Sequence, residues 1–351
     1  MAEHYFALSK EDQGEVLEQV RAKTGRPTHL LEKDVWVVWT LGALFKSPLA
    51  ADLTFKGGTS LSKVYKIIDR FSEDIDLTYD IRKLIADLTG GEEFLPANRS
   101  QASKWTKAVR DRLPGWIATQ VQPLLEAALE REQLAATLEI GGPEHDKLQL
   151  RYPAIKQGSG YVSPLVTLEF GGRSTGEPHQ VLPVTCDMAG HVDGVTVPVA
   201  SPQVMSVART FWEKATATHV YCAQGRIRGE RYARHWHDLA AIMRSAHFDA
   251  VITGDRTIGR SVAAHKSYFF SEKDAGGDII DYFAAVGGAL QIVPEGAARE
   301  ALATDYAKML EDEIMVGDAL PFDKLMQASA EVAARTNAAA RKLVYMPKAC
   351  T

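Results

Sequence analysis

The most informative part of the sequence is FKGGTSL at residues 55–61, followed closely by RFSEDIDL at residues 70–77. The pattern predicts a strand over about 53–55, a glycine turn, a helix over about 60–69 and a second strand over about 75–79. Asp74 and Asp76 are two residues apart, so on a strand both carboxylates point to one face while Ile75 and Leu77 point into the core. The segment therefore predicts a pair of parallel carboxylates close to a glycine turn.

These residue types suit the binding of a metal and a phosphate. Two neighbouring carboxylates repel each other unless a cation lies between them, and Mg²⁺ prefers oxygen ligands and bridges carboxylate to phosphate. A glycine pair, Gly57 and Gly58, allows a backbone to approach phosphates closely, and Thr59 and Ser60 add hydroxyl donors. Taken alone, two spaced aspartates are also common on exposed strands, and a glycine pair is often only a turn.

A third carboxylate lies on a later predicted strand. In VTLEF, residues 166–170, alternation places the valine, leucine and phenylalanine inward and Glu169 on the opposite face together with Thr167. Glu169 therefore lies on an outward face, and on this pattern alone a solvent-facing glutamate is the ordinary interpretation.

Composition excludes several classes of protein. The 351 residues carry 40 Lys and Arg against 45 Asp and Glu, a net charge of −5, so the chain is not a globally basic nucleic-acid coat. With 46% hydrophobic residues it can bury a core, which excludes disorder. Its 3 cysteines form no CxxC pair, which argues against a zinc site or a disulfide framework. The longest apolar run, 35–45, is shorter than the roughly 20 residues of a membrane span. We expect a cytoplasmic protein without a membrane partner.

The pattern changes along the chain. Ser9 and Asp12 predict the start of a helix that ends at Gly25, and a buried helix is expected over about 30–46. A helical pattern over 103–132 is interrupted at Pro114, and short alternating segments over about 137–199 predict strands. Ser201 as N-cap, followed by a proline, predicts that the remainder is helical. We expect a mixed α/β domain at 1–200 and a helical domain at 201–351.

Several separated segments are similar to one family. The glycine-to-aspartate combination resembles the nucleotidyltransferase superfamily with the polymerase-β-like fold. Four further segments resemble the AbiEii/AbiGii-type nucleotidyltransferase toxins, the toxin halves of bacterial toxin–antitoxin and abortive-infection pairs, which are related to the MenT enzymes. These segments are LEKDVWV (31–37), LEFGGRS (168–174), RTFWEKA (209–215) and RYARHWHDL (231–239). The resemblance covers about residues 30–240.

The resemblance implies a fold and a set of site residues. The fold is α/β (α+β): a polymerase-β-like mixed sheet with helices at 1–200, followed by a helical domain at 201–351 that contributes a lysine and an aspartate to the active site. Asp74 and Asp76 would hold the metal, and Glu169 would be a metal ligand or general base. The residues expected against the nucleotide are Gly57, Gly58, Thr59, Ser60, Ser72 and Lys214.

The lysine and the aspartate of the helical half are assigned by the same resemblance. Lys214 would place a point charge on the phosphates and offset charge on the departing pyrophosphate, whereas composition alone favours a solvated helix lysine. Asp238 would orient Lys214 or the acceptor. The alternative for Asp238 is a surface pair with Arg234, four residues earlier.

The activity implied is the transfer of a nucleotide from a nucleoside triphosphate to RNA. The cofactor would be Mg²⁺, with Mn²⁺ as the alternative, and the acceptor the 3′ end of tRNA, whose extension would block translation. A cognate antitoxin encoded alongside is a further implied partner. Two other readings remain: a phosphotransferase that modifies a protein, and a nucleotide-binding scaffold that is active only with a partner.

Some other features have two interpretations. Two basic clusters are candidates for RNA contact, although a charge run is usually a solvated face. Trp105 and Trp236 can stack on bases or belong to the core, and His235 with His237 lacks an evident third metal ligand. The clusters are Arg226, Arg228, Arg231 and Arg234, and Lys104, Lys107, Arg110 and Arg112.

Overall fold

The chain forms two compact units. A computed structural model describes residues 2–72, 74–92, 94–156, 163–227, 230–311, 315 and 319–344. The first unit comprises residues 1–66, 71–94 and 104–205, and the second comprises residues 67–70, 95–103 and 206–351. Among the helices of these described ranges, none is both long and apolar enough to cross a membrane.

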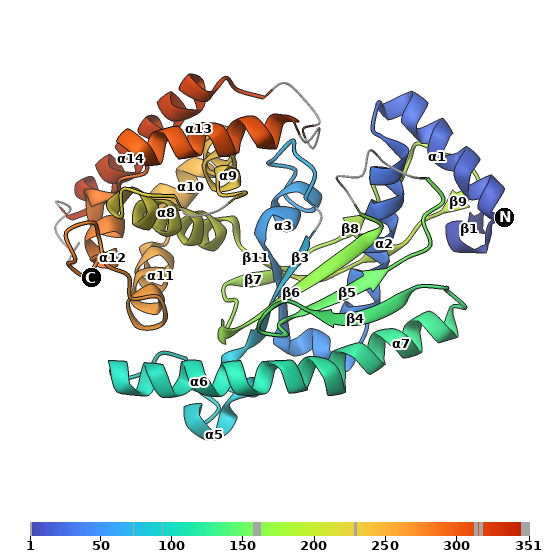
Figure 1. The fold of residues 1–351 in the computed structure, drawn as a ribbon, viewed down its shortest axis with the longest axis horizontal. Coiled ribbons are helices and arrows are strands. Elements are labelled where there is room, and N and C mark those ends of the chain that lie inside the picture. Colours follow the sequence, from blue (N-terminus) through green and yellow to red (C-terminus); the bar gives the residue numbers. More distant parts are fainter. Residues whose placement is uncertain are drawn as a thin grey trace, which may run out of the picture. The chain divides into compact units, whose positions relative to one another are not determined.

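The first unit is built on a seven-stranded mixed sheet (Figure 1). The strand order is β4-β5-β6-β3-β2-β11-β7, and β3 pairs with β2 antiparallel and with β6 parallel. The strands are β2 (Leu53–Lys56), β3 (Asp74–Asp80), β4 (Thr137–Gly141), β5 (Lys147–Arg151), β6 (Leu165–Ser174), β7 (His179–Val181) and β11 (Gln203–Met205). Two short pairs lie outside this sheet: β1 (Glu3–His4) with β9 (Val195–Thr196), and β8 (Val184–Thr185) with β10 (Val199–Ala200).

Alternation along the central strands separates the core from the polar face. Ile75 and Leu77 of β3 and Leu168 of β6 are fully buried, whereas Asp74 and Asp76 are half-buried. The predicted inward and outward faces of both strands are therefore confirmed.

Helices cover this sheet. α1 (Lys10–Thr24) begins at Ser9, whose hydroxyl accepts the Asp12 N–H, and ends at Gly25 in the left-handed conformation, as predicted. α2 (Thr28–Phe45) is almost entirely buried between α1 and the sheet. The remaining helices of this part of the chain are α3 (Gly57–Lys63), α4 (Ile81–Leu84), α5 (Ala86–Thr89), α6 (Arg99–Trp116) and α7 (Gln122–Arg131), with short turns η1 (Tyr5–Ala7), η2 (Pro48–Asp52) and η3 (Ile117–Val121).

Three local predictions were wrong. The helix expected over 60–69 is α3, which begins at Gly57 directly after β2 and ends at Lys63. α6 continues through Pro114, and the irregular π turn η3 follows it instead of a break. Ser201 does not begin a helix, because residues 203–205 pair with β2 and β7 as β11; Ser206 is the N-cap of the next helix.

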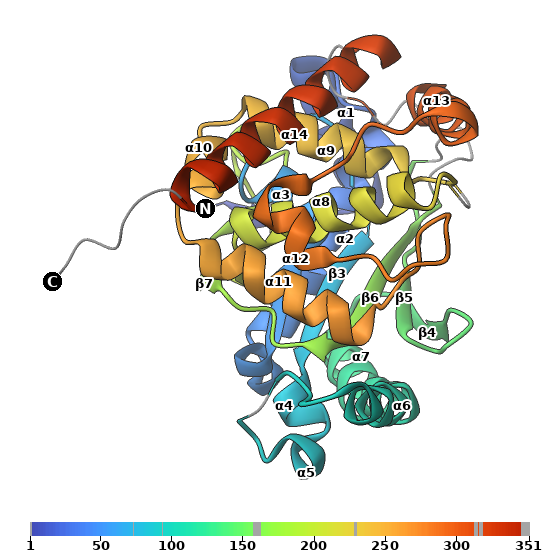
Figure 2. The same ribbon diagram turned by 90° about the vertical axis from the view of Figure 1, so that its left-hand side faces the viewer.

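The second unit is helical in its described residues. α14 lies alongside α9 and α10 (Figure 2). Asp305 accepts hydrogen bonds from the backbone N–H groups of Arg231 and Ala233, both at 2.6 Å, and so caps α9. The helices are α8 (Val207–Ala223), α9 (Ala233–Arg244), α10 (Phe248–Thr253), α11 (Arg256–Phe269), α12 (Tyr282–Ala284), η4 (Ala285–Ala289), α13 (Gly296–Glu311) and α14 (Phe322–Val344).

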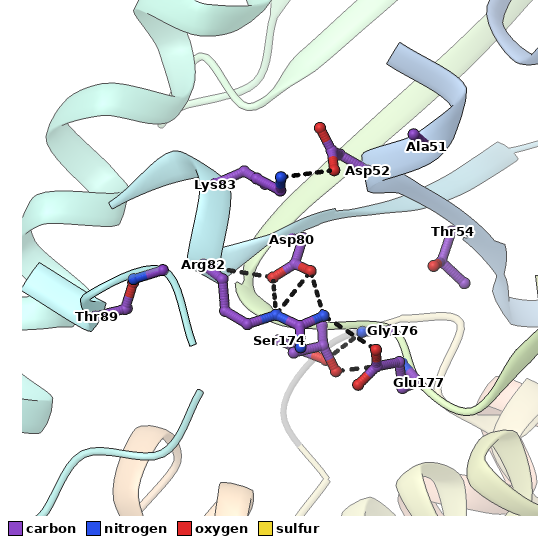
Figure 3. Close-up of polar contacts among 12 residues, drawn as sticks. Ala51, Asp52, Thr54, Asp80, Arg82, Lys83, Thr89, Ser174, Gly176 and Glu177 are labelled. Carbon is purple, nitrogen blue, oxygen red and sulfur yellow. Dashed lines mark hydrogen bonds and ion pairs between the residues drawn. The ribbon is translucent and has the colours of Figure 1, made fainter. Parts of the chain in front are cut away.

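One end of β3 is fixed by an ionic clamp (Figure 3). Asp80 accepts the Arg82 N–H at 2.8 Å, which caps α4, and both of its oxygens receive the Arg82 guanidinium. The same guanidinium reaches Glu177 at 3.0 Å. The hydrogen bonds that the Arg82 guanidinium donates to Asp80 raise the pKa of Arg82. The clamp holds the end of β3 opposite to Asp74.

A buried ion pair joins α3 to α2. The Lys63 Nζ lies 2.5 Å from Asp34 Oδ1 and 2.7 Å from Asp187 Oδ1, and both side chains of the Asp34–Lys63 pair are almost completely buried. Asp34 Oδ2 also accepts the Asp187 N–H at 2.6 Å. This ion pair therefore holds α3, the helix that begins at the glycine turn, against α2.

We predict that Asp34→Ala destabilises the protein strongly. The change removes one of two carboxylate partners of the buried Lys63 and also the acceptor of the Asp187 N–H, a combined loss of about 3 kcal/mol. Urea unfolding followed by circular dichroism measures the loss. The control is Lys107→Ala, which breaks an exposed pair with Asp111 and should cost less than about 1 kcal/mol. Equal effects of the two variants would contradict the assigned role of Asp34.

Candidate active site

Four charged side chains form one row across the sheet. Asp76 of β3 is in register with Lys56 of β2 on one side and with Glu169 of β6 on the other, and Glu169 is in register with Lys147 of β5. Residues in register on neighbouring strands share a face, so the row has the order cation, carboxylate, carboxylate, cation. Asp74 lies on the same face, two positions along β3 and opposite Thr167. The structure thus brings Asp74, Asp76 and Glu169 together.

The glycine turn lies directly against this row. Gly57 has a φ of +80°, and a Cβ added there would overlap the Asp76 carboxylate. Only glycine both adopts this backbone conformation easily and leaves the space that the carboxylate uses. The Asp76 side chain therefore points toward the turn.

The hydroxyl groups after the turn hold it in place. Thr59 Oγ1 donates to the carbonyl oxygen of Asp74 at 2.5 Å, which ties α3 to β3. Ser60 Oγ donates to the Gly57 carbonyl at 2.9 Å. Thr59, Ser60 and Gly58 are buried, whereas Ser72 is half-buried just before β3. The structure therefore shows an internal role for the Thr59 and Ser60 hydroxyls.

The two lysines of the row were missed by the sequence reasoning. Lys147 forms an ion pair with Glu169, and both side chains are partly exposed. Partial burial alone would lower the pKa of Lys147, but the carboxylates of Glu169, Asp74 and Asp146 raise it. The alternation in KLQLR, residues 147–151, indicates which face Lys147 occupies, but only the strand register shows that it meets Glu169.

The donor chemistry fits a divalent cation only in part. Asp74 and Asp76 offer carboxylate oxygens, the ligands that Mg²⁺ prefers, on an accessible face. In the described part of the chain, however, no group of three or more His, Cys, Asp or Glu side chains is arranged to enclose a metal. A cation at the aspartate pair would therefore take further ligands from water and substrate phosphate, as Mg²⁺ commonly does.

In the second unit, the fully buried Asp238 of α9 gathers two cations. Its oxygens receive the Arg70 guanidinium at 2.9 and 2.8 Å, and Lys214 Nζ of α8 lies 3.0 Å from Oδ2. Burial alone would raise the pKa of Asp238, but the positive charges of Arg70 and Lys214 hold it well below its ordinary value. Asp238 is therefore a buried residue and not a surface one, and it binds Arg70 and Lys214.

Arg70 was also missed, although it lies in the quoted stretch at 70–77. The nearby His235 carries no charge at neutral pH, because burial, and next the Lys214 charge, lower its pKa to about 3. His237 Nδ1 lies 3.3 Å from Asp238 Oδ1. Arg70 and Lys214 therefore both meet the Asp238 carboxylate, and the Lys214 side chain is 12% exposed.

Other predicted candidates have local roles. In the α6 cluster, Lys107 pairs with Asp111, Arg110 with Glu144 and Arg112 with Asp87, so this face is balanced by acids. Arg228 lies outside the described residues. Trp105 and Trp236 are buried in the core. Burial raises the pKa of the Cys222 thiol to about 12, so it is an unreactive thiol at neutral pH.

No curated protein matches the chain. Among solved structures, MenT4, a nucleotidyltransferase toxin from Mycobacterium tuberculosis H37Rv, is 16% identical, with 96% of this chain and 99% of that chain covered and a TM-score of 0.42. JHP933 from Helicobacter pylori is 11% identical, with 91% and 96% covered and a TM-score of 0.42. The sequence model of the nucleotidyl transferase AbiEii toxin of type IV toxin–antitoxin systems matches residues 39–328, and the chain therefore belongs to the AbiEii nucleotidyltransferase toxin family.

Proposed function

We propose that this toxin transfers a nucleotide from a nucleoside triphosphate to an RNA hydroxyl. The observation that carries the proposal is the set of three carboxylates, Asp74, Asp76 and Glu169, on one sheet face beside the turn at Gly57. Nucleotidyl transfer needs negative groups that gather cations near a triphosphate and a backbone that the phosphates can approach. The family membership supports the same activity.

Each residue has a proposed task. Asp74 and Asp76 hold Mg²⁺, or Mn²⁺ in its place, which when bound activates the attacking hydroxyl and offsets phosphate charge. Gly57 and Gly58 leave space for the triphosphate, Thr59 and Ser60 keep the turn in shape, and Ser72 contacts phosphate. Glu169 accepts the acceptor's proton or helps hold the cation.

The positive side chains act on charge that develops during transfer. Lys214 stabilises the departing pyrophosphate, while Asp238, itself fixed by Arg70, orients the Lys214 ammonium. Lys147 keeps Glu169 in place through their ion pair. In this proposal, Lys214 and Asp238 of the predicted 201–351 domain serve the same reaction as the carboxylates of the predicted 1–200 domain.

The acceptor proposed is the 3′ end of tRNA, in the cytoplasm. Extension of that end would prevent aminoacylation and so block translation, which suits a toxin, and an antitoxin encoded alongside would oppose it. Protein phosphorylation is the second candidate reaction, because a carboxylate pair beside a bound triphosphate also serves phosphoryl transfer.

Labelled triphosphates separate these reactions. Purified protein is incubated with total RNA and cell extract, with Mg²⁺ or with chelator, and with each triphosphate labelled at the α- or γ-phosphate. We expect α-label in RNA of tRNA size and no γ-label in protein. Gamma label in protein would establish the kinase reaction instead. Absence of any label in either would contradict catalysis by this chain alone.

We predict that Asp76→Asn abolishes most RNA labelling, by roughly 10²–10³-fold, because the row loses the carboxylate nearest the glycine turn. Initial rates of α-label transfer measure the effect. Glu139→Gln is the matched control, since Glu139 lies on the same strand face at the edge strand β4, opposite Gln149. Comparable losses in both variants would show that overall acidity of the face, and not the Asp76 position, matters.

We also predict that Gly57→Ala lowers the transfer rate by about 10²-fold, because the new methyl group displaces the Asp76 carboxylate. Gly90→Ala controls for backbone strain alone: Gly90 also has a positive φ, +66°, but no atom lies near its missing Cβ. If Gly57→Ala retains full activity, the contact between Gly57 and Asp76 has no functional importance.

A third prediction concerns Lys214→Met. The buried Asp238 keeps its two hydrogen bonds from Arg70, so the melting temperature should change little while RNA labelling falls by roughly 10²-fold. Differential scanning calorimetry and the labelling assay measure the two effects. If the variant is less stable but its folded fraction labels RNA at the wild-type rate, Lys214 has a purely structural role.

A further inference from the structure

The second unit contains a cavity of about 350 Å³. Its walls come from α8, α10, α11, η4 and α14, together with Phe283 of α12. This volume lies in the range of small-molecule sites and is on the order of ten times the volume of one water molecule. It lies apart from the Lys214–Asp238 pair, neither of which lines it.

Most of the wall is apolar and includes aromatic rings. Trp212 and Val251 are buried, and Phe283 is 43% exposed, which is unusual for a large apolar side chain. Gly259 also lines the cavity, and a Cβ there would crowd the Trp212 indole at 3.0 Å. The missing side chain thus leaves α11 close against the indole. This wall suits a flat apolar body.

The charge on the wall has one sign. Arg256 and Arg260 lie four residues apart on α11, so they share a side of the helix, and no carboxylate is among the described residues that line the cavity. Arg256 donates to the Ala340 carbonyl of α14 at 3.1 Å, which pins it beside the cavity. Arg260 is exposed and makes no ion pair with any residue that the structure describes. Two guanidinium groups without an acidic neighbour in the lining attract an anion.

A buried hydroxyl on the wall lacks a partner. Thr336 is 2% exposed, and its Oγ1 makes no hydrogen bond within the described parts of the chain. A buried polar atom left in this state is unfavourable, so a rotation of the Thr336 side chain toward a ligand in the cavity would gain a hydrogen bond. Thr336 therefore adds a polar group to the wall beside Arg256 and Arg260.

We propose that this cavity is a binding site for a small organic anion with a flat apolar body, such as an aromatic carboxylate. The carboxylate lies at Arg256 and Arg260, the ring packs between Trp212 and the aliphatic wall, and Thr336 bonds to a polar atom of the ligand. Such a site is separate from nucleotide transfer and does not depend on it. A bound ligand would join α8, α11 and α14 and so stiffen the helical unit.

The test is isothermal titration calorimetry of the whole chain with 2-naphthoate as the probe. We expect saturable binding at one site, and a rise in melting temperature with probe concentration. The uncharged 2-naphthamide has the same shape and should bind about tenfold more weakly, because it lacks the charge that the guanidiniums attract. Equal affinity of the two probes would overturn the anion assignment.

Variants locate the site. Arg260→Gln, at an exposed position, should weaken 2-naphthoate about tenfold, whereas the matched Arg244→Gln on α9 should leave the affinity unchanged. Ala340→Phe fills the cavity and should abolish binding. The proposal is wrong if wild-type protein binds no 2-naphthoate. It is also wrong if Arg260→Gln binds the probe as tightly as Arg244→Gln does. Both outcomes can be measured even where Ala340→Phe fails to fold.

Discussion

The close approach of the Asp76 carboxylate to the backbone of Gly57 is the constraint on which the first unit's site depends. The carboxylate occupies the space where any other residue at 57 would carry its Cβ. This one contact therefore constrains where β3 lies relative to the backbone at the start of α3. The hydrogen bond from Thr59 to the Asp74 carbonyl also ties α3 to β3, and the Asp34–Lys63 pair ties α3 to α2.

Much of this arrangement follows from local patterns. Alternation in β3 and β6 correctly placed the core residues and the carboxylates on opposite faces, because a strand with one buried face has only one acceptable side-chain arrangement. Ser9 and Gly25 correctly marked the ends of α1, since N-cap and left-handed C-cap chemistry is local. The family resemblance was confirmed over residues 39–328.

What the sequence could not show depends on contacts between distant segments. The meeting of Lys147 with Glu169 is a matter of strand register, and the pairing of Arg70 with Asp238 joins residues 168 positions apart. The predicted helix start at Ser201 was wrong for the same reason. A serine–proline pair is a good local N-cap, but residues 203–205 pair with β2 and β7 in the sheet and so cannot be helical. The roles of the predicted site residues in catalysis stay predictions, those of Asp74 and Asp76 as well as those of Glu169, Lys214 and Asp238.

The cation, carboxylate, carboxylate, cation order of the sheet row has a consequence for assembly. The row sums to zero, so mutual repulsion between Asp76 and Glu169 is relieved by the protein's own ammonium groups during folding. The two strands that carry the carboxylates can therefore pair without an added counter-ion, because each acidic side chain has a basic neighbour in the same register row.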